Sequence, residues 1–134
     1  MMKSFFIGNL EVKLPIVQGG MGVGVSLSGL ASAVANEGGV GVISCAGLGL
    51  IHKGHGDFLQ NCIGGLQEEL RIAREKTTGI IGVNIMVALS NFADMARTAI
   101  AEKADIIFAG AGLPLDLPLY KTANSETKLV PIVS

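Results

Sequence analysis

Leu129-Val130-Pro131-Ile132-Val133-Ser134 closes the chain, and this stretch predicts a short buried β-strand at 129–133 with no helix after it. Similar apolar runs predict strands at 12–17, 40–44, 80–87 and 104–109. Helical spacing of apolar residues between these runs predicts helices over 27–37, 57–76 and from 91 onward, and one helical turn at 116–120. This alternation of strand and helix is the repeat of a parallel α/β fold.

Two architectures contain this repeat, and the end of the chain helps to separate them. A doubly wound open sheet, such as a flavodoxin-like binding domain, would be complete in itself. A TIM (β/α)8 barrel typically needs about 250 residues, so residues 1–134 would supply only about its first five strands. An open sheet would leave its last strand without a covering helix and expose two strand edges. We therefore expect a truncated barrel, with residues 1–134 as the N-terminal part of one domain.

Composition agrees with a buried sheet and argues against several classes of partner. Hydrophobic residues make up 49% of the chain, charged residues 16%, and glycine occurs 19 times. The net charge is −1 and the basic residues are scattered, so neither nucleic acid nor a membrane surface is an expected partner. Residues 14–36 carry no charge, but Pro15 and five glycines favour a strand, a turn and a helix over a membrane span. No signal peptide is recognisable, which makes a cytoplasmic location the expectation.

Polar residues mark the ends and outer faces of the predicted helices. Ser26 and Asn91 are expected N-caps, because their side chains can accept hydrogen bonds from the first helical N–H groups. Glu68, Glu69 and Arg71 are expected on the solvated face of the helix at 57–76.

The histidines and cysteines are not predicted to form a metal or acid–base site. His52 and His55 lie in a glycine-rich stretch at 47–56, and without a matching ligand set a solvated loop is the favoured interpretation. Cys45 and Cys62 have no metal-binding spacing and are predicted to be core residues.

Three groups of residues are expected at the carboxyl ends of the predicted strands, where parallel α/β folds bind ligands. They are Gln18-Gly19-Gly20-Met21-Gly22, Asn84, and the stretch from Gly110 to Pro114. Glycines let a flat ligand approach backbone N–H groups, and an amide in an apolar strand needs a hydrogen-bond partner. The residues alone leave open a plain turn at each glycine group and an internal hydrogen bond at Asn84. The patterns G-x-G-x-x-G and G-x-x-x-x-G-K-[ST] are absent, which disfavours NAD-type and P-loop nucleotide sites.

Five motifs occur in the order and spacing of one known family. They are PIVQGGMG at 15–22, GGVGVIS at 38–44, GVNIM at 82–86, ADIIFAGAGLP at 104–114 and KLVPIVS at 128–134. Through these motifs, which span nearly the whole chain, the sequence resembles the nitronate monooxygenase family, formerly called nitropropane dioxygenase. That family includes the flavin-dependent enoyl-ACP reductases.

The resemblance implies a TIM barrel that binds FMN non-covalently at the carboxyl ends of its strands. It assigns cofactor contacts to Gly20, Met21, Gly22, Asn84, Gly110 and Ser134. It assigns the border of the substrate space to Gly112, Leu113 and Pro114. The family's catalytic histidine and its phosphate-binding loops are expected beyond residue 134, so no catalytic residue is assigned here.

The function implied by the resemblance is FMN-dependent oxidation of alkyl nitronates with O2. One alternative is reduction of an enoyl thioester with a nicotinamide cofactor. A further alternative, motivated by the exposed strand edges, is a non-catalytic half-barrel that associates with itself or with another chain.

Overall fold

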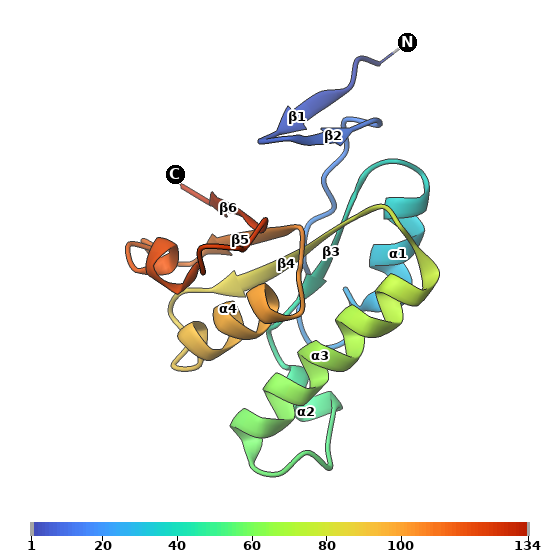
Figure 1. The fold of residues 1–134 in the computed structure, drawn as a ribbon. Coiled ribbons are helices and arrows are strands. Elements are labelled where there is room, and N and C mark those ends of the chain that lie inside the picture. The colour runs from blue at the N-terminus through green and yellow to red at the C-terminus, as the bar shows by residue number, and fades with distance from the viewer. Residues whose placement is uncertain (1, 134) are drawn as a thin grey trace.

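A four-stranded parallel sheet forms the centre of the molecule (Figure 1). The computed structural model describes residues 2–133. The strands, in spatial order, are β3 (Val40–Ser44), β4 (Ile80–Met86), β5 (Ile106–Gly110) and β6 (Lys128–Pro131). Val17 adds a parallel bridge to Val40, so the segment 16–18 occupies the position before β3. The strand order therefore follows the sequence without reversal.

The helices all pack on one face of this sheet (Figure 1). They are α1 (Ser28–Asn36), α2 (Leu48–Ile51), α3 (Phe58–Lys76) and α4 (Phe92–Ala101), with a 3-10 turn, η1, at Leu117–Tyr120. Their buried side chains form the main core with one face of the strands, including Ile43, Val83 and Ile107. A doubly wound sheet carries helices on both faces, whereas a barrel carries them only outside. One-sided covering is therefore the arrangement of a barrel segment.

The other face of the sheet carries a second, smaller core at the amino ends of the strands. A hairpin of β1 (Phe5–Ile7) and β2 (Leu10–Val12) packs its apolar side chains against Val40, Val42 and Ile106. The prediction of a strand at 12–17 was wrong, because its first residue belongs to the hairpin and only a bridge remains near Val17. Pro15 has no N–H to donate to a ladder, which weakens this stretch as a strand. The hairpin therefore covers the interior face of the sheet at the amino ends of its strands.

Residues paired in register stand side by side on this second face. One such row contains Ser44, Asn84, Phe108 and Val130. Two residues before Asn84 on β4, a Cβ at Gly82 would lie 2.7 Å from Cε2 of Phe108, so this glycine makes room for the aromatic ring. Ser44 and Asn84 are the polar residues of this row.

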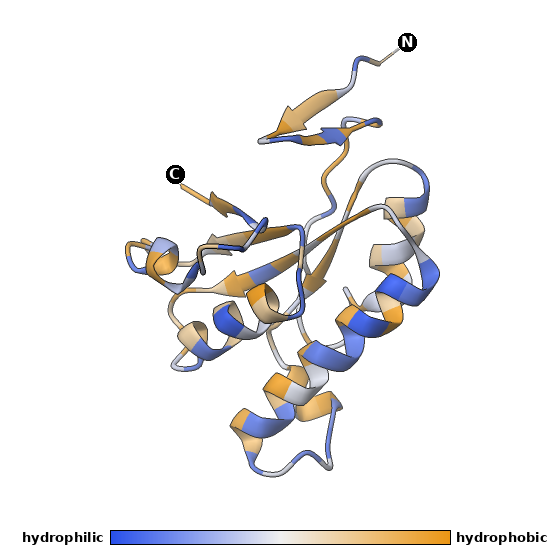
Figure 2. Ribbon diagram, in the orientation of Figure 1, coloured by the Kyte–Doolittle hydropathy of each residue, from blue (hydrophilic) through white to orange (hydrophobic). Residues whose placement is uncertain are grey.

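The predicted helices are present, but two of their expected caps are wrong. α3 begins after Asp57, whose carboxylate accepts from the Gln60 N–H in a capping box. The N-cap position of α1 is Leu27, and the Ser26 hydroxyl instead accepts from the Met21 N–H. Asn91 is at the N-cap position of α4, but its side chain makes no capping hydrogen bond. The predicted loop at 47–56 contains the short helix α2. Polar and apolar segments alternate along the ribbon of α3, as expected for a helix that covers a core (Figure 2).

In the uncharged stretch 14–36 the predicted turn and helix are present, as a loop and α1, while the predicted strand is reduced to the bridge at Val17. Among residues 2–133, no helix combines the length and the apolar character needed to cross a membrane.

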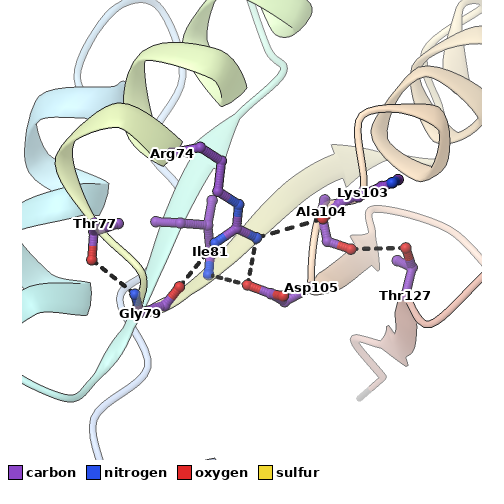
Figure 3. Close-up of polar contacts among 8 residues, drawn as sticks. All are labelled: Arg74, Thr77, Gly79, Ile81, Lys103, Ala104, Asp105 and Thr127. Atoms are coloured by element: carbon purple, nitrogen blue, oxygen red, sulfur yellow. Dashed lines mark hydrogen bonds and ion pairs between the residues drawn. The ribbon is translucent and has the colours of Figure 1, made fainter.

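An ion pair links α3 to the residue before β5 at the amino ends of the strands (Figure 3). Arg74 Nη2 lies 2.6 Å from Asp105 Oδ2, and Nη1 donates to the carbonyl of Gly79. The same carboxylate oxygen accepts from the Ile81 N–H at 2.8 Å. Thr127 donates to the Ala104 carbonyl beside this pair. In barrels this end of the sheet serves stability rather than chemistry.

Candidate active site

The loop after segment 16–18 lies across the carboxyl ends of the neighbouring strands. A Cβ on Gly20 would stand 2.7 Å from Asn84 Cβ, so the loop backbone rests directly on that residue. A Cβ on Gly22 would stand 2.8 Å from the Cβ of Ala46, which follows β3. Met21 lies between the two glycines with 63% of its surface exposed. Close packing against the strand ends thus requires glycine at positions 20 and 22.

Gln18 and Ser26 hold this loop, a role that sequence reasoning assigned to neither of them. Gln18 Oε1 accepts from the Val42 N–H at 3.1 Å, and its Nε2 donates to the Val42 carbonyl at 3.1 Å. Ser26 is buried, and its Oγ accepts both from Gln18 Nε2 and from the Met21 N–H. The position of Gln18 within the motif at 15–22 was the one signal available in the sequence.

Asn84 lies at the carboxyl end of β4, half-buried beneath Gly20. The internal hydrogen bond considered from the sequence is not formed by its side-chain amide within residues 2–133. Its backbone carbonyl accepts from Cys45 and keeps the strand end in place. The amide is thus oriented by a regular strand and remains able to donate and accept.

The residues after β5 form a turn beside this point. Gly110 pairs in register with Met86, and a Cβ on Gly110 would stand 3.1 Å from Ile132 Cβ. Ala111 and Gly112 both adopt positive φ, 58° and 142°, and redirect the chain away from the sheet. Leu113 is 70% exposed and Pro114 is half-buried.

The residues predicted from the sequence therefore lie at one edge of the sheet, but at different distances from one another. Gly20 and Asn84 are in contact, Gly110 lies one strand away, and the stretch 112–114 lies on the turn beyond it. Ser134 lies outside the described residues.

Comparison with known proteins identifies the family of the chain. A sequence model of the nitronate monooxygenase family matches residues 3–132. The chain belongs to the nitronate monooxygenase family. Two solved structures similar to this family member are FabK from Thermotoga maritima and its M276A mutant, each with 29% sequence identity. Their TM-scores are 0.69 and 0.73, and the matches cover 90% and 92% of this chain. No curated protein matched.

The same comparisons define how much of the family fold the chain represents. The chain spans 34% and 36% of the two FabK chains, about a third of their length. Together with the sequential parallel strands and the one-sided helices, this confirms the expected class, a TIM barrel represented by about its first five strands.

His52 lies in the loop after α2, but its side chain is only 13% exposed and not solvated as predicted. His52 Nε2 lies 2.9 Å from Glu69 Oε1, and its Nδ1 lies 3.3 Å from Glu68 Oε2. Glu69 is buried, contrary to expectation, and its other oxygen accepts from the Ser28 N–H at 2.7 Å. This carboxylate from α3 therefore supplies the N-terminal cap that α1 lacks.

Both cysteines are buried and free, which confirms their prediction as core residues. Burial raises the pKa of the Cys45 thiol well above its usual range, and the nearby Cys62 adds to the effect. Because the thiolate is the reactive form, Cys45 is not suited to act as a nucleophile.

Proposed function

We propose that this chain is the cofactor-binding N-terminal part of an FMN-dependent oxidoreductase. The observation that carries the proposal is the contact between the Gly20 backbone and Asn84 at the carboxyl edge of the sheet. The N–H groups of Gly20 and Gly22 have no acceptor within residues 2–133. A side chain at either glycine would collide with Asn84 or Ala46, so glycine keeps the loop backbone against the strand ends. We expect a flat ring with hydrogen-bonding edges to approach the free N–H groups of this backbone.

Each residue of the site has a role in this proposal. Gly20, Met21 and Gly22 would lie along the flavin ring, Asn84 would hydrogen-bond its edge, and Gly110 would leave space beside it. Bound flavin would supply one- and two-electron transfer, while the protein orients the ring and sets its surroundings. Ser134, which lies outside the described residues, is proposed to approach the cofactor.

The substrate space is proposed to lie on the side of Gly112, Leu113 and Pro114. Oxidation of an alkyl nitronate with O2 is the reaction that the family match supports first. Reduction of an enoyl thioester with a nicotinamide cofactor is the second candidate. It is favoured by the apolar rim of this turn, where Leu113 is 70% and Leu115 79% exposed, because an acyl chain needs an apolar surface.

The first experiment is to purify the product of the native gene and identify any flavin released on denaturation. FMN in a ratio near one to one supports the proposal, and an intact product that neither retains nor rebinds FMN refutes it. O2 uptake with an alkyl nitronate, against NADH oxidation with an enoyl thioester, then separates the two reactions.

A non-catalytic half-barrel remains the alternative from another functional class. Ile16 and Val17 at one edge of the sheet and Ile132 beside the other are about half exposed, which would suit self-association. Size-exclusion chromatography of a flavin-free product decides this point, since a stable monomer contradicts association through these edges. A cytoplasmic location, and no nucleic-acid or membrane partner, complete the proposal.

A further inference from the structure

We propose that Gln18 is the positioning residue of the glycine loop. In this view the Gln18 side-chain amide makes the two hydrogen bonds to Val42 that the main chain would otherwise make, so the backbone at Gly20 is free to leave the sheet and pack on Asn84. Ser26 fixes the next residue, because its hydroxyl accepts from the Met21 N–H. The inference that this loop contacts a flavin rests on the function proposed above. The inference that Gln18 and Ser26 position the loop is independent of that function.

The first step is the pairing between segment 16–18 and β3. The Val40 N–H donates to the Ile16 carbonyl at 2.9 Å, and the Gln18 N–H donates to the Val40 carbonyl at 3.0 Å. In a regular parallel ladder the next rung would join Val42 to the Gln18 carbonyl and the Gly20 N–H. Both bonds of Val42 are instead made by the Gln18 side chain, through Oε1 and Nε2 at 3.1 Å each. One pair of inter-strand hydrogen bonds is thus made by a side chain in place of the main chain.

The second step is the freedom that this substitution gives to the following residues. Since Val42 is already paired, the backbone at Gly20 leaves the sheet without orphaning polar groups in the strand. It passes over Asn84 with the close contact described above. The Gly20 N–H, which a regular ladder would have consumed, has no acceptor within residues 2–133.

The third step is the role of Ser26, which is 1% exposed. Its Oγ accepts from the Met21 N–H at 2.9 Å and from Gln18 Nε2 at 3.2 Å, and the hydroxyl donates to the Gly19 carbonyl at 3.4 Å. The Ser26 carbonyl in turn accepts from Ser44 at the end of β3. The Met21 N–H is therefore not available to a ligand, whereas the N–H groups of Gly20 and Gly22 are among the unbonded backbone donors of this loop within residues 2–133.

The test uses Gln18→Glu and Ser26→Ala in the full product of the native gene. Gln18→Glu keeps the acceptor for Val42 but removes the two Nε2 donor bonds, and Ser26→Ala removes the acceptor of Met21. The matched control is Thr127→Val, which removes a buried hydroxyl bonded to the Ala104 carbonyl at the opposite end of the strands. The two readouts are amide hydrogen exchange without added flavin and the dissociation constant of FMN.

In Ser26→Ala we expect exchange of the Met21 N–H to accelerate by about tenfold or more, as for the loss of one hydrogen bond. In both site variants we expect FMN to bind about tenfold more weakly, with a changed flavin absorption spectrum in the holoprotein. The control should leave Met21 exchange and FMN affinity at the wild-type values even if it lowers stability.

Two results overturn the inference, and neither depends on the other. Unchanged exchange at Met21 in Ser26→Ala, or throughout residues 19–22 in Gln18→Glu, shows that these side chains do not hold the loop. Wild-type FMN affinity in variants whose exchange has changed shows that the loop geometry does not serve the cofactor. If the wild-type product itself binds no FMN, the proposed function fails, and the exchange data still decide the positioning role. Should Gln18→Glu not fold, Ser26→Ala alone decides.

Discussion

Gly20→Ala should damage the candidate site, and its neighbour provides a matched control. The added Cβ would stand 2.7 Å from Asn84 Cβ, 3.3 Å from Asn84 Cγ and 3.3 Å from Val42 Cγ1. Carbon atoms in contact prefer about 3.5–4.0 Å, so the loop or Asn84 must move by roughly 1 Å. Gly20 is not in the left-handed region, so the cost is steric, and overpacking of this kind destabilises by about 1–3 kcal/mol.

Gly19→Ala supplies the comparison, because a Cβ there meets no atom within 4 Å and its φ is also not positive. It should be neutral or stabilise the fold by about 0.4–1 kcal/mol through the unfolded chain. Urea unfolding and FMN titration of both variants are the assays. We expect Gly20→Ala to lose stability and at least about tenfold in FMN affinity, the equivalent of 1.4 kcal/mol. Equal behaviour of the two variants would refute the close contact between the loop and Asn84.

Three further predictions concern strain, the bottom of the sheet and pH. Val23 is β-branched yet has φ 51°, so Val23→Asn should raise the free energy of unfolding in urea by about 1 kcal/mol; no gain would argue against the strain. Asp105→Ala leaves the Ile81 N–H and Arg74 without their acceptor, and should cost about 1–3 kcal/mol in the same assay while FMN affinity stays unchanged. Because burial raises the pKa of Cys45, the folded chain keeps a proton that the unfolded chain releases at high pH. Its contribution is therefore present below the ordinary thiol pKa of about 8.5 and is lost above it, by up to about 1.4 kcal/mol per pH unit. A Cys45→Ala variant with the same slope of stability against pH would contradict this.

The parallel strands were predictable because their apolar runs are short and bounded by breakers. The strand at 40–44 was predicted at its observed bounds, since Gly38 and Gly39 end the preceding helix and the run itself is buried on both faces. The hairpin at the amino end was not predicted. Its two strands have three residues each, and their apolar positions continue into the run at 12–17. Short strands of this kind give too few residues for periodicity to separate them.

The location of the candidate site could be predicted from the sequence, but the side-chain hydrogen bonds that hold its loop could not. Carboxyl ends of parallel strands share one edge, so Gly20 and Asn84 were expected to be near each other. The pairing of Gln18 with Val42 spans 24 residues and leaves no periodic signal. Glu69 did carry a signal that went unused, because it lies three residues after Leu66 and four before Ala73, both on the buried face of α3.

The hairpin at the bottom of the sheet has a consequence for the order in which the chain folds. A Cβ at Gly8 would lie 2.8 Å from Lys128 Cε, and the hairpin shares its apolar cluster with Val130. About 120 residues separate these contacts in sequence, so on the ribosome the hairpin waits roughly 6–24 s for its last neighbour at 5–20 residues per second. The helices and strands between them assemble from nearer neighbours in the meantime. The hairpin can thus start to dock on β3 but completes its contacts only after β6 has been made, and contacts of such high contact order slow folding.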